Sequence, residues 1–198
     1  MALGGGETLE AGGDRAARVM SSSSSKVDLV MVLLRVLALL ATVSAALIMG
    51  FNKQTRTIVV ATIGTTTVQA TLTAKFQHTP AFVFFVIANG IASLHNLLML
   101  VVSFIGPPKL FERIAPSAIP VFDLMNVAIV SGGASAAAFM GQLGRDGNSH
   151  ARWNKICDKI DSFCDRGGGA MIASFIGLVL IIIICSLSII RLRRYNTI

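Results

Sequence analysis

The stretch Val27–Phe51, VDLVMVLLRVLALLATVSAALIMGF, is an apolar run long enough to cross a bilayer as an α-helix. Its single arginine, Arg35, stands about two helical turns in from the start of the run. An arginine inside hydrocarbon costs from about 2.5 to more than 10 kcal/mol. We therefore expect the rest of the chain to give Arg35 a partner, a water path or a route to the interface.

The whole composition agrees with a membrane protein. Of the 198 residues 54% are hydrophobic and only 14% are charged, with a mean hydropathy of +0.72. A soluble domain is about one quarter charged. Apolar runs of spanning length occur at Val27–Phe51, Ala81–Ile105, Ala118–Met140 and Met171–Ile190. The sequence predicts an all-α membrane protein, a single four-transmembrane-helix bundle over residues 27–194.

The net charge of +7 does not indicate nucleic-acid binding, because the basic residues are spread over tails and loops. The densest basic group, Arg191–Arg194, directly follows the fourth span, where such clusters meet anionic cytoplasmic lipid. Both loop cysteines, Cys157 and Cys164, lie on the opposite side of the predicted membrane, where a disulfide requires an oxidising compartment. We therefore predict cytoplasmic N- and C-termini and contact with membrane lipids.

The segments between and beyond the spans have distinct compositions. Residues 1–26 are rich in Gly, Ala and Ser and predict a disordered cytoplasmic tail, residues 106–117 a short inner loop, and residues 195–198 a cytoplasmic end. The first outer loop, 52–80, alternates Val, Ile and Thr around Gly64, which predicts a β-hairpin with strands near Thr57–Ile63 and Thr66–Lys75.

The second outer loop, 141–169, carries apolar residues at helical spacing between charged ones. Trp153, Ile156, Ile160 and Phe163 form this pattern, and it predicts a short amphipathic helix that Gly167–Gly169 ends. We expect Trp153 and Phe163 to shape the outer surface of the loop.

Asp123 is the other charged residue well inside a span, in the inner half of the predicted third helix. Spans one and three run in the same direction, so Arg35 and Asp123 fall at similar depth and predict an Arg–carboxylate ion pair. The alternative is that the pair lines a proton or ion path in a small transporter or channel. A structural ion pair is favoured, because the two charges neutralise each other and no further carboxylates accompany them.

Span two carries a stripe of polar side chains, Asn89, Ser93 and Asn96, at i, i+4 and i+7. Such residues usually form hydrogen bonds with neighbouring helices. His95, beside the stripe, is interpreted as a packed or interfacial histidine. It has no second histidine or carboxylate at metal-ligand spacing, so we predict no metal site and no cofactor.

Small residues repeat every fourth position in span three. Gly133, Ala137 and Gly141 form one seam, and Ala128, Gly132 and Ala136 form a second. Small residues let helices approach closely, either within one bundle or between protomers. The sequence does not choose between these two arrangements.

Cys157 and Cys164 lie seven residues apart, and a loop disulfide between them is favoured over two free thiols. Cys185 lies inside the fourth span and is the odd cysteine. The chain contains no phosphate loop, nucleophile elbow or HExxH motif, so we expect no enzymatic activity.

Taken together, these features resemble the Casparian strip membrane domain protein-like family of plants, which is related to MARVEL-domain four-span proteins. The resemblance rests on the four spans with Arg35 and Asp123, on the stretch FQHTPAFVFFVIANGIASLHNLL (Phe76–Leu98), and on Trp153, Cys157, Phe163 and Cys164 in the second outer loop. The first outer loop resembles the broader "-like" group and lacks the signature of the strip-forming members.

The resemblance implies a plasma-membrane scaffold. The founding members of this family form homo- and hetero-oligomers and recruit cell-wall-modifying enzymes to a membrane domain. For this chain we accordingly expect a scaffold that self-associates, with itself, related family members and extracellular wall-modifying enzymes as partners.

Overall fold

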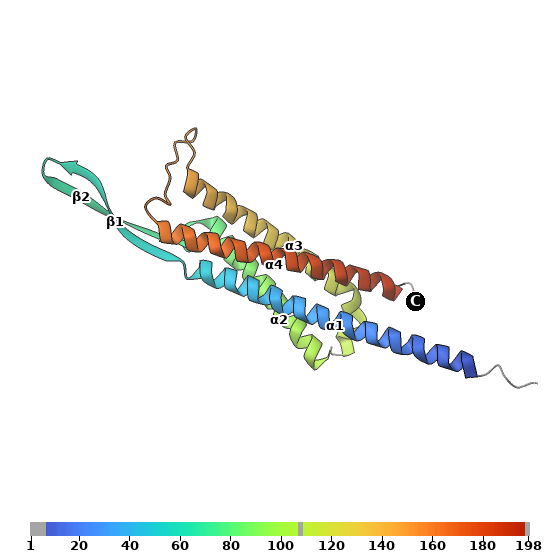
Figure 1. Cartoon of the computed structure of the whole chain (residues 1–198). Helices are drawn as coiled ribbons and strands as arrows, with labels where there is room; N and C mark the ends of the chain where they lie inside the picture. The colour runs from blue at the N-terminus through green and yellow to red at the C-terminus, as the bar shows by residue number, and fades with distance from the viewer. Residues whose placement is uncertain (1–6, 107–108, 197–198) are drawn as a thin grey trace, which may run out of the picture.

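The computed structural model describes residues 7–106 and 109–196. Within these ranges four long helices form one bundle: α1 (Glu7–Gly50), α2 (Pro80–Ile105), α3 (Lys109–Asp146) and α4 (Asp161–Asn196). Each contains a segment long and apolar enough to cross a membrane, namely Val27–Gly50, Pro80–Ile105, Ser117–Asp146 and Asp161–Arg193. The predicted four-span architecture is confirmed (Figure 1).

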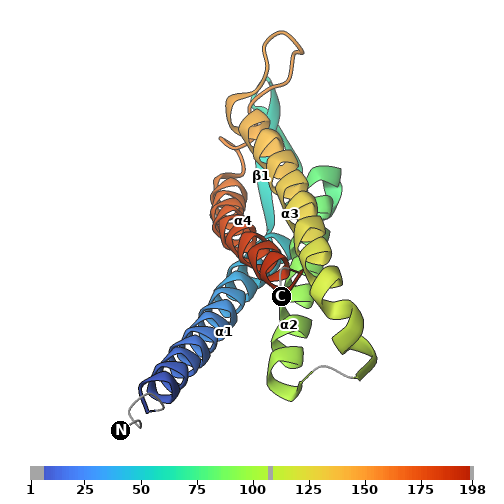
Figure 2. The same cartoon turned by 90° about the vertical axis from the view of Figure 1, so that its right-hand side faces the viewer.

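The four helices form a ring in which α1 contacts α2 and α4, and α3 also contacts α2 and α4. The first residues of α1 and the last residues of α4 lie at the same end of the bundle (Figure 1). An ion pair of 2.8 Å between Asp28 and Arg191 joins these two helices at that end. The connections β1–β2 and 147–160 lie at the opposite end (Figure 2).

The interior is packed largely by small residues. One buried cluster toward the loop end includes Ala45, Phe85, Ala137 and Ala170, and a second includes Ala38, Ala92, Val130, Ile181 and Ile184. Alanines in the interface let transmembrane helices approach closely and gain van der Waals contact. Large aliphatic side chains such as Leu40 and Leu94 point outward and are more than half exposed. That arrangement suits a bundle whose surroundings are lipid.

The first inter-helix connection is a β-hairpin of two antiparallel strands, β1 (Lys53–Ile63) and β2 (Thr66–Lys75). The alternation of Val, Ile and Thr predicts these strands, although β1 begins at Lys53 rather than Thr57. Gly64 has a φ of 64° and is the first of two turn residues, the position that a type II′ hairpin turn reserves for glycine. A short 3-10 helix, η1 (Phe76–His78), then leads into α2.

The helices extend further than the apolar runs that predict them. Helix α1 begins at Glu7, so the prediction of a disordered tail is wrong for residues 7–26, while residues 1–6 lie outside the described ranges. Once a helix exists, each added residue of a good helix former gains one hydrogen bond, and residues 7–26 contain several such residues. Helix α3 likewise begins at Lys109, within the predicted inner loop 106–117.

The predicted short helix of the second outer loop is not formed. Residues 147–160 are irregular, with Asn148 bridged to Trp153, and α4 begins at Asp161 and continues through Gly167–Gly169. The side-chain oxygen of Asn148 accepts the backbone N–H groups of His150 and Ala151, which holds a turn where a helix would start. The apolar residues at helical spacing therefore fall in two different elements. Trp153, Ile156 and Ile160 lie in the irregular loop, whereas Phe163 lies in α4.

Candidate functional site

Arg35 and Asp123 form a bidentate ion pair in the interior of the bundle. The guanidinium nitrogens of Arg35 donate to Oδ1 of Asp123 at 3.2 Å and to Oδ2 at 3.0 Å. Arg35 is 5% exposed and Asp123 1% exposed. Paired N–H···O bonds of this kind are the strong, geometrically specific form of an ion pair. The pair joins α1 to α3.

The same carboxylate receives hydrogen bonds from the other two helices. Ser188 on α4 donates to Oδ2 of Asp123 at 2.8 Å, and Nε2 of His95 on α2 lies 2.8 Å from Oδ1. Asp123 therefore has four donors, two from Arg35 and one each from His95 and Ser188. Each of the four helices contributes to this polar layer, which we call the Asp123 cluster: Arg35, His95, Asn96, Asp123 and Ser188.

Asn96 belongs to the cluster at longer range. Its side-chain oxygen lies 3.5 Å from Nη1 of Arg35, and its amide nitrogen donates to the carbonyl of Ala92 at 2.9 Å. Within residues 7–106 and 109–196, no three His, Cys, Asp or Glu side chains are grouped so as to hold a metal ion. The contacts of the cluster neutralise charge and form hydrogen bonds among buried side chains, where each such bond is strong.

Helical periodicity explains part of this arrangement. Asp123, Asn126, Val130 and Ala137 are all buried, because they recur on one face of α3. Sequence reasoning placed Arg35 and Asp123 at one depth and Asn96 on a stripe facing neighbouring helices, but assigned His95 and Ser188 no role in the cluster. Ser188 carries no signal of its own, since it is one of two serines, with Ser186, in an isoleucine-rich segment.

A second buried polar layer lies nearer the loop end and joins three helices. Ser174 on α4 donates to the side-chain oxygen of Asn89 on α2 at 2.9 Å. The Ser93 hydroxyl lies 2.9 Å from the Thr42 hydroxyl on α1. Asn89, Thr42 and Ser174 are fully buried. Thus Asn89, Ser93 and Asn96, the predicted stripe on α2, all face neighbouring helices, and Thr42 and Ser174 are partners that the sequence does not reveal.

The seam Gly133–Ala137–Gly141 packs inside the bundle. A Cβ added at Gly133 would lie 2.9 Å from the Cβ of Ala88 and 3.3 Å from the Cα of Phe85 on α2. A Cβ added at Gly141 would lie 3.0 Å from the Met171 side chain on α4, and Ala137 is fully buried. The structure therefore selects the intramolecular arrangement for this seam.

At the loop end of the bundle, a disulfide between Cys157 and Cys164 links the loop 147–160 to α4. The two Cα atoms lie 5.7 Å apart. Cys185 is a free, buried cysteine. Phe163 is 7% exposed and its ring lies 6.1 Å from that of Phe82, so this residue belongs to the core rather than to the outer surface. Trp153, in contrast, is 57% exposed.

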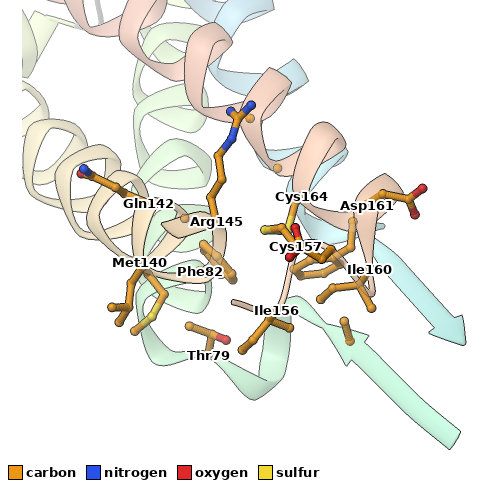
Figure 3. A pocket seen from close by; sticks show the side chains of 18 of the residues that line it. Thr79, Phe82, Met140, Gln142, Arg145, Ile156, Cys157, Ile160, Asp161 and Cys164 are labelled. Carbon is orange, nitrogen blue, oxygen red and sulfur yellow. A yellow bond between two sulfur atoms is a disulfide. The ribbon is translucent and has the colours of Figure 1, made fainter. Parts of the chain in front are cut away.

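A hollow of about 1070 Å³ lies between the base of the hairpin, the loop 147–160 and the ends of α2, α3 and α4. Its apolar lining includes Phe82, Met140 and Ile160, and Arg145 and Asp161 lie among its charged residues. In Figure 3, Met140 and the Cys157–Cys164 disulfide lie on opposite sides of Phe82. The disulfide thus helps to shape the wall of this hollow.

Comparison with known proteins shows which family this chain belongs to. The family model described as the Casparian strip membrane protein domain matches residues 24–180. A CASP-like protein 1B2 of Populus trichocarpa is 60% identical over 163 residues, which cover 82% of each chain. A CASP-like protein 1B2 of Vitis vinifera is 52% identical over 194 residues, covering 98% of this chain and 95% of its own.

The similarity also extends over a complete relative. A CASP-like protein 1B1 of Glycine max is 49% identical over 198 residues, the full length of both chains. No solved structure matches this chain. The family match agrees with the four membrane-spanning segments of the structure. The chain belongs to the CASP-like family of plant multi-pass membrane proteins, which carry the Casparian strip membrane protein domain.

Proposed function

We propose that this protein is a plasma-membrane scaffold that self-associates, alone or with related CASP-like proteins, and thereby organises a membrane domain. The name of the matched domain and the names of the relatives support a role in structuring a membrane. A scaffold needs a body that holds one shape and presents the same outer surface in every copy. It needs no catalytic group.

The observation that carries this proposal is the saturation of Asp123. Four donors from three other helices surround its carboxylate, and the residue is 1% exposed. A carboxylate that serves as a binding site for a transported ion or proton must exchange its partners. One that holds four helices in register keeps all of them. The Asp123 cluster therefore favours a permanent structural role over a conduit.

The orientation of the scaffold follows from its two ends. Arg191, ion-paired with Asp28, lies at the end of the bundle where α1 begins and α4 ends, and further basic residues follow it in the sequence. The Cys157–Cys164 disulfide lies at the other end and requires an oxidising compartment. In our proposal the termini are cytoplasmic and the hairpin, the loop 147–160 and the hollow face the cell wall.

The outward end is then the surface that meets extracellular partners. Trp153 is 57% exposed beside the hollow, and aromatic residues of this kind are enriched at protein interfaces. We propose that cell-wall-modifying enzymes are recruited at this surface, with Trp153 as a contact residue.

The proposal is tested first by fluorescence recovery after photobleaching of a C-terminally tagged chain in plant root and leaf cells. Slow recovery in bounded plasma-membrane patches is the expected result. Fast and uniform recovery, together with monomers in native-membrane extracts, would contradict the scaffold. Ion and solute flux measured in vesicles containing the purified chain tests the rival conduit, for which flux would be lost on replacement of Asp123.

A further inference from the structure

The β1–β2 hairpin projects beyond the helical bundle (Figure 1). Side chains at its base form hydrogen bonds with α4. Gln54 and Arg56 both donate to Oδ1 of Asp161 at 3.0 Å. Above this base, β2 is exposed from Thr66 to Thr71, and Val59 and Val68 are 58% and 45% exposed.

The register of the hairpin gives it two unlike faces. Ile58 pairs with Ala70 and Ala61 with Val68, and cross-strand partners share a face, so one face is apolar. Thr57 pairs with Thr71 and Thr55 with Thr73 on the other, polar face. A two-stranded ribbon is marginal in water, and three or more strands with an apolar face are needed for stability. The projecting part of this hairpin thus lacks a third strand.

The free edge of β2 is unprotected. Exposed edge strands are normally defended by charged side chains, prolines or bulges. From Thr57 to Ala74 the chain has neither a charged residue nor a proline. A bulge interrupts the register in β1 between Val59 and Ala61, whereas β2 pairs without a shift from Thr66 to Lys75. The outer edge of β2 is therefore the most open position for an added strand.

The direction of the strands selects the partner. Four spans hold every copy of this chain upright in the same sense, so β1 leads away from the membrane in every copy and β2 returns toward it. When copies stand side by side, β2 of one copy meets β1 of the next in antiparallel orientation. Antiparallel pairing is the slightly more stable kind. A contact between two β2 strands in one membrane would instead be parallel.

We propose that the free edge of β2 pairs with β1 of a second copy of this chain in the same membrane, so that hairpins of neighbouring copies build one antiparallel sheet. The contact is heterologous, which generates a ring or an open row of copies rather than a closed dimer. It joins the apolar faces of successive hairpins into one wider face. This inference rests on the proposed self-association and assigns the surface that produces it.

The groups that form the contact follow from the register. The hydroxyls of Thr55 and Thr73 lie 3.2 Å apart, as expected for the closer, non-hydrogen-bonded kind of cross-strand pair. Thr73 then directs its backbone N–H and C=O away from β1, and by two-residue alternation so do Thr71 and Gln69. These residues are the backbone donors and acceptors that the neighbouring β1 strand would meet.

The test is cysteine cross-linking in native plant membranes, in full-length chains in which Cys185 is replaced by Ala. One population carries Thr57→Cys on β1 and a differently tagged one carries Thr71→Cys on β2, joined by a short flexible bis-maleimide. We expect the mixed cross-link to exceed both same-site cross-links several-fold. Dominance of the Thr71→Cys same-site product would overturn the head-to-tail arrangement.

A backbone variant makes the test independent of the cysteines. Gln69→Pro removes an N–H that faces away from β1, so the hairpin ladder is kept while the donor to the neighbour is lost. We expect Gln69→Pro to reduce the mixed cross-link to background, and the matched control Gln69→Ala to leave it unchanged. If co-purification of differently tagged copies shows self-association without any mixed cross-link, the hairpin contact is wrong and the scaffold stands. If copies do not co-purify at all, both proposals fail.

Discussion

Nε2 of His95 lies 2.8 Å from Oδ1 of Asp123, within the buried Asp123 cluster that also holds the Arg35–Asp123 ion pair. An ionised carboxylate only accepts hydrogen bonds, so Nε2 of His95 must carry a proton and donate. This fixes one ring nitrogen of His95 as a donor and makes α2, after α1 and α4, the third helix that bonds to Asp123 on α3. A single carboxylate on α3 thus forms hydrogen bonds with side chains from each of the other three helices.

Replacing His95 tests this assignment. His95→Leu removes a donor to a charged acceptor, which is expected to lower the free energy of unfolding by about 1.5–3 kcal/mol. His95→Gln retains an N–H donor at a similar reach and should lose clearly less. The measurement is thermal unfolding of the detergent-solubilised chain. Equal losses for the two variants would mean that His95 contributes packing rather than a hydrogen bond.

The ion pair itself is tested by single and double replacement. Arg35→Leu or Asp123→Asn alone leaves a buried charge without its partner and is expected to destabilise the bundle by about 3–5 kcal/mol. The double variant leaves no stranded charge, so it should be more stable than either single variant. The measurement is again thermal unfolding, combined with abundance of the chain in native membranes.

The same three variants distinguish a scaffold from a conduit. A scaffold regains membrane abundance and patch formation in the double variant, because neutral side chains restore the packing of the helices. A proton or ion path through Arg35 and Asp123 would lose flux in all three. Recovery of stability without any recovery of patches would separate the ion pair from the scaffold function.

Close packing of α3 on α2 predicts a large effect from one methyl group. Gly133→Ala places a Cβ 2.9 Å from the Cβ of Ala88, so the two helices must separate, at an expected cost of about 1–3 kcal/mol. The matched control is Gly90→Ala on α2, where an added Cβ meets nothing within 4 Å and no loss is expected. Equal unfolding temperatures for these two variants would contradict the intramolecular seam.

The disulfide predicts the reactivity of all three cysteines. Because Cys157 and Cys164 are bonded and Cys185 is buried, the folded chain isolated from membranes should react with no maleimide. Reduction should expose two reactive thiols, and unfolding a third. Cys157→Ser removes the covalent link between the loop 147–160 and α4, so limited proteolysis should then cut this loop faster. Labelling of three thiols without reduction would contradict the disulfide.

The sequence by itself determined the membrane architecture. Helices that cross lipid must satisfy every backbone polar group internally, so a long apolar run leaves the chain almost no alternative to a helix. The position of Arg35 and the parallel direction of spans one and three then bring Asp123 to the same depth. The hairpin likewise follows from a local pattern, since alternating Val, Ile and Thr around Gly64 specify both the strands and their turn.

Tertiary structure decided the rest, because the deciding contacts join residues far apart in the chain. Ser188 and Thr42 are ordinary polar residues until helix packing brings Ser188 to Asp123 and Thr42 to Ser93. The helical spacing before Cys164 misled the sequence analysis, because local turn bonds and the link between Cys157 and Cys164 set the course of that loop. Similarly, only the packed bundle shows that Gly133 faces α2 rather than a neighbouring protomer, since a seam of small residues allows close approach to either.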